Sequence, residues 1–377
     1  MRILYIAYPL LPVSEESCGG AEQVLWTLET EMASRGHETV VAACEGSRVS
    51  GEVFVTGAAA TKPDTFEERN AEHVQRILAL LAATQRSTAR FDLIHDHSGT
   101  FWRHAEKVDV PVLATLHLPR SFYPAPAFES LPPNLHFVCV SDFQHQSFSN
   151  RIGDIDDGCP RFAARFCPLT WAEKVFVIRN GIRVHNFPAP DGRPREDYLL
   201  WLGRICEEKG AHVAIDVARQ AGKKLIIAGD VYPFSYHQQY FAREIDPHLG
   251  KQIRFVRKPS FAEKVELLRR ASALLLPSLV DETSSLVAME AMACGTPVIA
   301  FRRGAIPEVV RDGITGFIVN TTEEMASALT RIAEIDPASC RRYVEEKFSA
   351  ARVANDYERL YREFIEERGA SRQMNAA

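Results

Sequence analysis

The chain has 377 residues, of which 46% are hydrophobic and 25% are charged, and its formal net charge is −5 at pH 7. This length exceeds the size at which a single hydrophobic core usually keeps growing, so two domains are expected. The acidic balance gives no indication of a nucleic-acid-binding protein, and no apolar run reaches the ~18 residues that would span a bilayer.

The cysteines and the beginning of the chain favour a soluble cytoplasmic protein. Eight cysteines are scattered without a CxxC pair, mostly in apolar surroundings such as "FVCV", which is typical of reduced core thiols rather than of disulfides or a zinc site. The opening "MRILYIAYPLLPV" lacks a small-residue cleavage site, so we interpret it as a buried strand and not as a signal peptide.

In the first half of the chain, short apolar runs alternate with helical patterns. The run "RILYIAY" precedes a helix expected over residues 21–35, and a second helix is expected over "FEERNAEHVQRILALLAAT". The other expected strands are "HETVVAAC", "FDLIHDH", "VPVLATLH", "HFVCVSD" and "KVFVIRNG". Several of them end in polar or small residues, as in parallel sheets that bind ligands at the carboxyl ends of their strands.

A second alternating set follows "FPAPDGRPRED", which is rich in proline and charge and which we interpret as a linker over residues 187–197. The second set contains the expected strands "YLLWLG", "KKLIIAGD", "IRFV", "ALLLPS", "PVIAF" and "GFIV". The pattern predicts an α/β fold with two doubly wound Rossmann-like domains, 1–186 and 198–350, facing a cleft. Residues 351–377 are expected to form a final helix with a frayed tail.

The loop "LGRICEEKG" follows the first expected strand of the second half. It places Arg204 and Lys209 five positions apart before a helix, where a guanidinium and an ammonium could together bind a diphosphate. Ordinary solvation of a loop beside Glu207 and Glu208 is the alternative interpretation.

The stretch "DETSSLVAMEAMACGTPVIAF" places Glu282 and Glu290 around the start of a helix. The free backbone N–H groups at Ser284, Ser285 and Leu286 favour a phosphate oxygen, and either serine could cap the helix. The two carboxylates would then be available for the hydroxyl groups of a sugar or ribose. The alternative is an acid that favours the helix dipole, together with a solvated glutamate.

Two further sites are indicated in the first half. Gly19 and Gly20, in "CGGAE", would allow close approach of the backbone to an anion, although a plain strand–helix turn uses such glycines too. His117 is placed to face the cleft or to be a satisfied structural histidine. His95 and His97 share a strand face, but no carboxylate or cysteine completes a ligand spacing, so no metal is expected.

The motifs "GGAE", "HDH", "TLH", "VSD", "IRNGI", "GRICEEKG", "IAGD" and "MEAMACGTPVIAF", in this order, resemble those of the retaining glycosyltransferases of family 4, which have the GT-B fold. The resemblance covers nearly the whole chain. The segments "YFAREIDPHL" and "AFRRGAIPEVV" further resemble the subgroup near the avilamycin-type and tetrahydrobiopterin glucosyltransferases.

The resemblance implies a role for each candidate residue. Arg204 and Lys209 would neutralise the donor diphosphate, Glu282 would contact the hydroxyl groups of the donor sugar, and Glu290 would contact the ribose. Gly19 and Gly20 would meet the phosphate from the other domain, and His117 would lie near the reacting sugar and the acceptor. It also implies that no metal or other cofactor is required, that the leaving phosphate takes the acceptor proton, and that the last helix crosses back to the first domain.

One departure concerns Thr283, Ser284 and Ser285, which stand where the family usually has Gly-Phe-Gly or Pro-Phe-Gly. Serine resists the φ > 0 geometry that glycine accepts, so the departure favours a changed donor or a loss of activity. UDP-glucose is the expected donor, and the acceptor is a small molecule or a glycan. A non-catalytic nucleotide-sugar-binding protein and a nucleotide-sugar epimerase remain the alternatives, and no basic amphipathic helix supports membrane contact.

Overall fold

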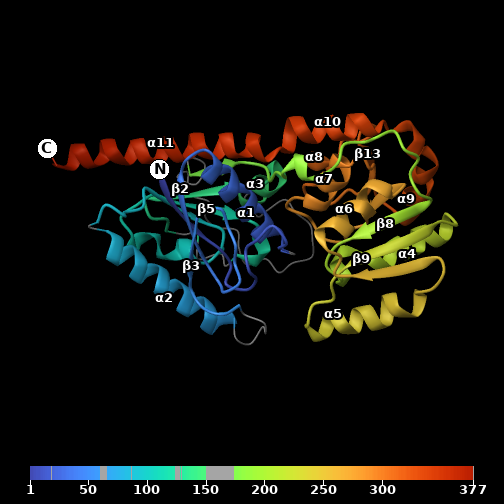
Figure 1. Ribbon diagram of the computed structural model, residues 1–377, viewed down its shortest axis with the longest axis horizontal. Helices are drawn as coiled ribbons and strands as arrows, with labels where there is room; N and C mark the ends of the chain where they lie inside the picture. Colours follow the sequence, from blue (N-terminus) through green and yellow to red (C-terminus); the bar gives the residue numbers. More distant parts are fainter. Residues whose placement is uncertain are drawn as a thin grey trace. The chain divides into compact units, whose positions relative to one another are not determined.

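The structure, a computed structural model, describes residues 1–17, 19–59, 66–85, 87–123, 128, 130–149 and 174–376, without the side chains of 149 and 369–376 (Figure 1). It divides into two compact units. Unit 1 comprises Met1–Asn180 and Val353–Ala377, and unit 2 comprises Gly181–Arg352. The segment "SFYPAPAFES" (121–130) and the irregular segment 151–170, which are expected to be loops that contact the acceptor, lie partly and wholly outside the described residues, respectively.

Unit 1 is built on a seven-stranded parallel sheet with the order β3-β2-β1-β4-β5-β6-β7. The strands are β1 (Arg2–Ile6), β2 (Glu38–Ala43), β3 (Glu52–Val55), β4 (Leu93–Asp96), β5 (Val112–Leu116), β6 (Leu135–Cys139) and β7 (Val175–Val177). The helices are α1 (Gly20–Ser34), α2 (Phe66–Thr84), α3 (Asp142–Ser149) and α11 (Ala350–Ala376).

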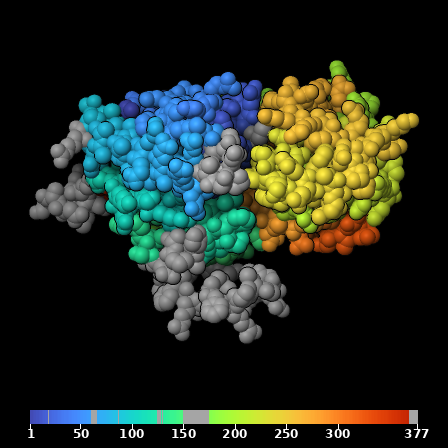
Figure 2. All heavy atoms as spheres, turned by 90° about the horizontal axis from the view of Figure 1, so that it is seen from below, coloured from blue at the N-terminus to red at the C-terminus, as the bar shows by residue number. Residues whose placement is uncertain are grey.

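Alternate residues of these strands enter two separate cores, one on each face of the sheet. On one face Leu4 and Ile6 pack with Val74 and Ile77 of α2. On the other face Ile3 and Tyr5 pack with α1 and with buried residues of α11, which are Val353, Ala354, Tyr357, Leu360, Tyr361 and Phe364. Helix α2 carries its polar side on the surface of unit 1, where Figure 2 shows it in light blue.

Unit 2 contains a six-stranded parallel sheet with the order β10-β9-β8-β11-β12-β13. Its strands are β8 (Tyr198–Leu202), β9 (Lys224–Gly229), β10 (Ile253–Arg257), β11 (Ala273–Leu276), β12 (Val298–Phe301) and β13 (Gly316–Val319). Its helices are α4 (Ala211–Gln220), α5 (Ser235–Tyr240), α6 (Phe261–Arg270), α7 (Leu286–Ala293), α8 (Ile306–Val309), α9 (Thr322–Ala328) and α10 (Pro337–Phe348).

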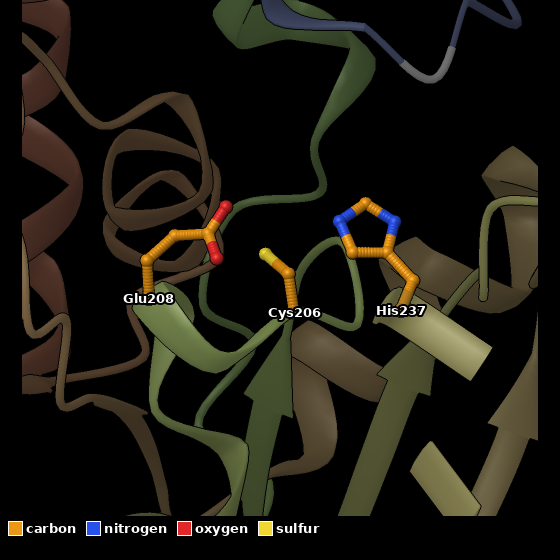
Figure 3. Close-up of side chains that lie close together, drawn as sticks. All are labelled: Cys206, Glu208 and His237. Atoms are coloured by element: carbon orange, nitrogen blue, oxygen red, sulfur yellow. The ribbon is translucent and has the colours of Figure 1, made fainter. Parts of the chain in front are cut away.

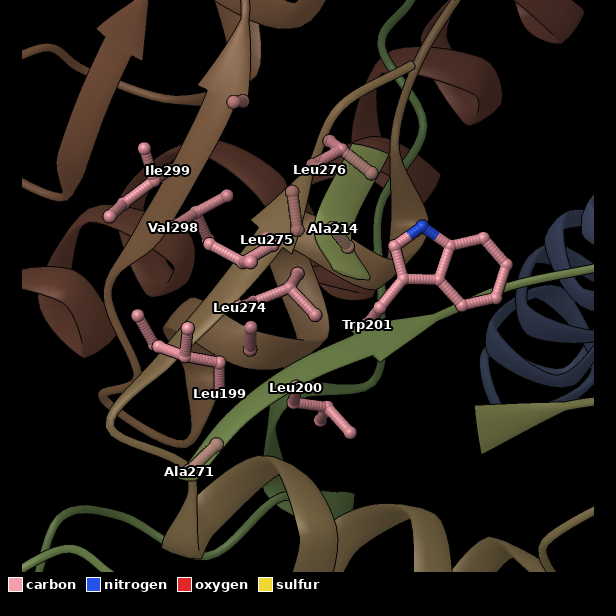
Figure 4. Close-up of a cluster of buried hydrophobic side chains, with 14 of the residues drawn as sticks. Leu199, Leu200, Trp201, Ala214, Ala271, Leu274, Leu275, Leu276, Val298 and Ile299 are labelled. Atoms are coloured by element: carbon pink, nitrogen blue, oxygen red, sulfur yellow. The ribbon is translucent and has the colours of Figure 1, made fainter. Parts of the chain in front are cut away.

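The core of unit 2 consists of apolar runs from the central strands and the helices around them. Figure 4 shows residues of β8, β11 and β12 in one cluster, including Leu199, Leu274 and Val298. Because both faces of a parallel sheet are covered, such strands are nearly continuously hydrophobic, and the expected alternation of strands and helices is confirmed. No described helix is long and apolar enough to cross a membrane.

Three features differ from the sequence expectations. Strand β3 was not anticipated, because it is an edge strand of four residues whose side chains are all exposed or half-buried. The short helices α3 and α5 were also missed, since they are too short for a helical period to stand out. The change of domain was placed at 187–197, whereas Ile182, Val184 and Phe187 already lie in the core of unit 2.

Candidate functional site

The order of strands reverses between β8 and β11 in unit 2 and between β1 and β4 in unit 1. In an open parallel sheet, ligands bind outside the carboxyl ends of the strands at this reversal. The loops that follow these four strands carry Arg204, Lys209 and Glu282 in unit 2, and Gly19 and His97 in unit 1. The candidate residues therefore fall where the topology favours a site.

In unit 2, Lys209 and Glu282 are in direct contact. The Lys209 Nζ donates to both carboxylate oxygens of Glu282, at 2.6 Å and 2.8 Å. The Ser278 hydroxyl donates to the same carboxylate. Only 12% of the Glu282 side chain is exposed, against 30% of that of Lys209, so the ammonium is the more accessible partner.

The backbone around this pair is held by close contacts that require glycine. Gly210 has φ +69°, and a Cβ there would lie 2.1 Å from the Pro277 carbonyl oxygen. Gly304 has φ +54°, and a Cβ there would lie 2.3 Å from the Glu282 carbonyl oxygen, which accepts a 2.7 Å hydrogen bond from the Ala305 N–H. These approaches fix the loops that position Lys209 and Glu282.

Arg204 is paired within its own loop. Its Nη2 donates to Glu208 at 3.1 Å, and its guanidinium lies 5.9 Å from the centre of the Tyr232 ring. Both side chains of this ion pair are more than a third exposed, so the pair contributes little to stability and the guanidinium can exchange partners. Within the described part of the chain, no hydrogen bond or ion pair joins Arg204 to Lys209 or Glu282, so the binding of one anion by both cations remains a prediction.

Helix α7 begins as the sequence indicated, and the structure distinguishes between the two candidate caps. Ser285 is the N-cap, and its hydroxyl accepts a 3.3 Å hydrogen bond from the Ala288 N–H. Leu286 is the first helical residue, and Ser284 is half-buried beside it.

Glu290, inside α7, is buried and is bonded to Lys264 of α6 at 2.6 Å. Lys264 also lies 5.0 Å from the centre of the Phe261 ring. Lys264 was not predicted as a site residue, because it has an ordinary position in the helical pattern "FAEKVELLRRA". The Lys264 side chain is 16% exposed, and its ammonium pairs with a carboxylate that would otherwise be unpaired in the core.

In unit 1, the glycine pair lies at the start of α1. Gly19 is the N-cap and Gly20 is the first residue of the helix. A Cβ on Gly19 would lie 1.9 Å from a carboxylate oxygen of Glu22, so the space that was expected to admit an anion holds this carboxyl group. Burial raises the pKa of Glu22 to about 7. Glu22 is the last residue of the motif "CGGAE", but it was not predicted as a site residue.

The three histidines of unit 1 form a connected group at the carboxyl ends of β4 and β5, with His95 in β4 itself. His117 Nε2 lies 2.9 Å from His97 Nδ1, and His97 Nε2 lies 3.3 Å from His95 Nδ1. His95 in turn contacts the Tyr361 hydroxyl of α11 at 2.5 Å and the Thr115 hydroxyl at 2.8 Å. Burial lowers the pKa of His117 to about 4 and lowers the pKa of His95 and of His97, so all three rings are neutral at pH 7.

The structure thus brings the predicted residues into two groups, one in each unit. In unit 2 it joins Lys209 to Glu282 and places Ser284, Ser285, Leu286 and Glu290 on the adjoining segment and helix. In unit 1 it joins His117 to His97 and places Gly19 and Gly20 at the start of α1.

Two family models match the chain. Residues 18–156 match "Glycosyltransferase Family 4", and residues 196–334 match "Glycosyl transferases group 1". The first match lies within unit 1 and the second within unit 2.

Individual relatives agree with these matches. Glycogen synthase of Mycobacterium tuberculosis is 28% identical over 95% of this chain and 91% of its own. The solved structure of AviGT4, a glycosyltransferase of avilamycin A biosynthesis, has a TM-score of 0.69 at 20% identity and covers 97% of this chain and 98% of its own. The Anabaena protein HepE, solved with UDP and glucose, has a TM-score of 0.70 at 16% identity, and the match covers 96% of this chain and 99% of HepE. The likeness to the solved structures shows a GT-B fold.

Proposed function

Because the chain belongs to the glycosyltransferases of family 4, we propose that it transfers a hexose from a nucleotide-diphosphate sugar to an acceptor hydroxyl with retention of configuration. UDP-glucose is the proposed donor, supported by the fold shared with a protein that was solved with UDP and glucose. The acceptor is a small molecule or a glycan.

The observation that carries this proposal is the contact of Lys209 with Glu282 outside the reversal point of the unit 2 sheet. An ammonium has three N–H donors, so Lys209 can hold Glu282 and still donate to a phosphate oxygen. The N-terminus of α7 follows Glu282 after three residues, and its free N–H groups favour the same anion. A phosphate and a sugar hydroxyl could therefore be bound side by side.

Arg204 would exchange Glu208 for the diphosphate, because a phosphate with more negative charge binds a guanidinium in the same forked geometry. Glu290 would accept hydrogen bonds from the ribose through the carboxylate oxygen that Lys264 does not hold. Lys264 would hold this buried carboxylate in place, which makes it a positioning residue.

We propose that the chemical step requires no metal. The two cations and the helix N-terminus would stabilise the charge that develops on the leaving diphosphate, and a leaving oxygen would take the proton of the acceptor hydroxyl on the same face of the sugar. A neutral His117 could accept or donate a hydrogen bond to the sugar or the acceptor without adding charge.

A thermal-shift panel of nucleotide diphosphates and their sugars, with and without EDTA, tests donor binding. A ligand at 100 times its dissociation constant adds about 2.7 kcal/mol to the free energy of unfolding. We expect a selective shift with UDP and UDP-glucose that EDTA leaves unchanged. A shift with another nucleotide would replace the donor, and a shift abolished by EDTA would contradict metal independence.

A non-catalytic nucleotide-sugar-binding protein is the second candidate, because Thr283, Ser284 and Ser285 replace the residues usual in the family. Product analysis separates the possibilities. A transferase releases UDP quickly only when acceptor is present, an epimerase releases UDP or a new sugar without one, and a binding protein leaves the donor intact.

A further inference from the structure

A cysteine, a glutamate and a histidine lie close together in unit 2, outside the residues assigned to the donor (Figure 3). Cys206 follows β8, Glu208 lies in the short 3-10 turn Glu207–Lys209, and His237 lies on α5. One thiol sulfur, one carboxylate oxygen and one ring nitrogen lie within 4.8 Å of one another. Residues about 30 positions apart in the chain thus offer three potential ligand atoms at one place.

His237 provides a second and independent observation. It is 0% exposed, yet neither ring nitrogen has a hydrogen-bond partner among the described residues. The rings of Tyr232, Phe234 and Tyr236 pack around it, and such contacts do not engage the in-plane lone pair of an imidazole. Buried polar groups are almost always paired, so this ring, unpartnered within the described residues, points to a bound ligand.

We propose that Cys206, Glu208 and His237 bind a Zn²⁺ ion. Sulfur, imidazole nitrogen and carboxylate oxygen are the three ligand types that zinc takes in proteins, and three protein ligands leave a fourth position for water or an anion. Ligand atoms around zinc lie closer together than 4.8 Å, so binding would draw the three side chains inward.

The protonation states can accommodate the ion. Burial raises the pKa of the Cys206 thiol to about 11, so the free protein holds the thiol form. A coordinated thiol is deprotonated, and its proton passes to solvent as the metal binds. Glu208 uses one carboxylate oxygen for Arg204, and the other oxygen can bind the metal.

The ligand set also predicts selectivity. Mg²⁺ and Ca²⁺ prefer several oxygen ligands, and this cluster offers only one carboxylate, so neither should bind here. Zn²⁺ and Co²⁺ accept thiolate and imidazole and should both bind.

The test titrates the full chain, stripped with a chelator and dialysed, with Zn²⁺ against a chromogenic competitor. We expect one high-affinity Zn²⁺ per chain that excess Mg²⁺ does not displace. Cys206→Ser and His237→Ala should each weaken binding by more than about 100-fold, since loss of even an outer-shell partner costs about 10–100-fold. Cys44→Ser and His248→Ala, which remove a thiol and an imidazole elsewhere, should bind as the unaltered chain does.

Cobalt provides a spectroscopic readout of the sulfur ligand. The Co²⁺ protein should show a thiolate-to-cobalt charge-transfer band that is absent in Cys206→Ser and present in Cys44→Ser. Should a core variant fail to fold, as judged by its circular dichroism, Glu208→Gln supplies the test, because the half-buried Glu208 can be replaced by an amide of the same shape.

The proposal would be overturned if the unaltered chain failed to bind one Zn²⁺. It would also be overturned if Cys206→Ser and Glu208→Gln bound Zn²⁺ as tightly as the unaltered chain does. These readouts use neither nucleotide nor acceptor, so they stand or fall separately from the proposed transferase activity.

Discussion

At the scale of single residues, the Lys209–Glu282 pair raises the question of whether the contact serves donor binding or stability. The carboxylate is mostly buried, but it also accepts from Ser278, so the loss of the ammonium would not leave it without a hydrogen bond. The Lys209 side chain is the more exposed partner, and we propose that it also binds the diphosphate.

We therefore predict that Lys209→Ala lowers kcat/KM by about 100-fold, because a contact made chiefly in the transition state contributes on the order of 3 kcal/mol to the barrier. The melting temperature should change little. Steady-state kinetics and thermal unfolding check this. Lys223→Ala is the matched control, since Lys223 forms an exposed 2.7 Å ion pair with Asp197 in the same unit, and it should keep full activity. Equal loss of fold and activity in Lys209→Ala would instead show a structural role.

Glu22 gives a prediction about pH. Burial raises its pKa from 4.5 to about 7 in the folded state, so between these values the folded protein binds more protons than the unfolded one. The contribution of Glu22 to stability is thus most favourable below pH 4.5 and is lost as the pH rises through about 7. The resulting decrease in the free energy of unfolding is about 3 kcal/mol.

Replacing Glu22 with Gln removes this titration. The stability of Glu22→Gln relative to the unaltered chain should increase as the pH rises through the same range. Chemical denaturation of both proteins at a series of pH values measures the difference, in which the titration of all other groups cancels. A difference that does not vary with pH would show that the carboxyl group is not buried in solution.

At the scale of elements, the residues before α7 differ from those usual in the family. The structure explains one of them, because Ser285 is the N-cap of the helix. Ser285 caps the helix through its side chain, and Ser284 does not. An N-cap hydroxyl satisfies one of the backbone N–H groups that a helix leaves unpaired at its first turn.

Ser285→Ala should lower the free energy of unfolding by about 1 kcal/mol, the usual cost of losing an N-cap side chain. Ser284→Ala should leave stability within about 0.5 kcal/mol of the unaltered chain, since its position caps nothing. Urea unfolding of the two variants side by side measures the contrast. Equal losses would mean that the cap is shared or that it shifts to Ser284.

At the scale of the whole molecule, unit 1 is completed by the end of the chain. Helix α11 covers the sheet face that carries Ile3 and Tyr5, and its Glu358 bonds Arg35 of α1 at 2.7 Å. Its Tyr357 and Tyr361 hydroxyls meet Thr115 and His95, so the helix also contacts the histidine group.

A chain truncated after Arg352 should therefore lose cooperative unfolding of unit 1, because it exposes the part of this sheet face that α11 covers. A chain that ends at Arg368 keeps all the residues of α11 that are described as buried and should fold normally. Limited proteolysis and circular dichroism compare the two. Native-like protection of residues 1–180 in the shorter chain would contradict the role given to α11.

The local periodicity of the sequence was sufficient to predict most of the helices and strands. Apolar runs identified twelve of the thirteen strands, all except β3, and the helical pattern over residues 21–35 identified α1. The periodicity could not find β3 or α5, because an edge strand and a single-turn helix bury too few side chains to leave a pattern.

By itself, the sequence determined the α/β class, the glycine-containing loops after the strands and the identity of Arg204, Lys209, Glu282 and Glu290 as candidates, because these depend on residue type and on neighbours in the chain. Only the tertiary structure decided which partner each charge has. Glu282 meets Lys209 across 73 positions, and Glu290 meets Lys264 across 26. Such pairings arise when strands far apart in the chain become neighbours in one sheet, and no local pattern of residues encodes them.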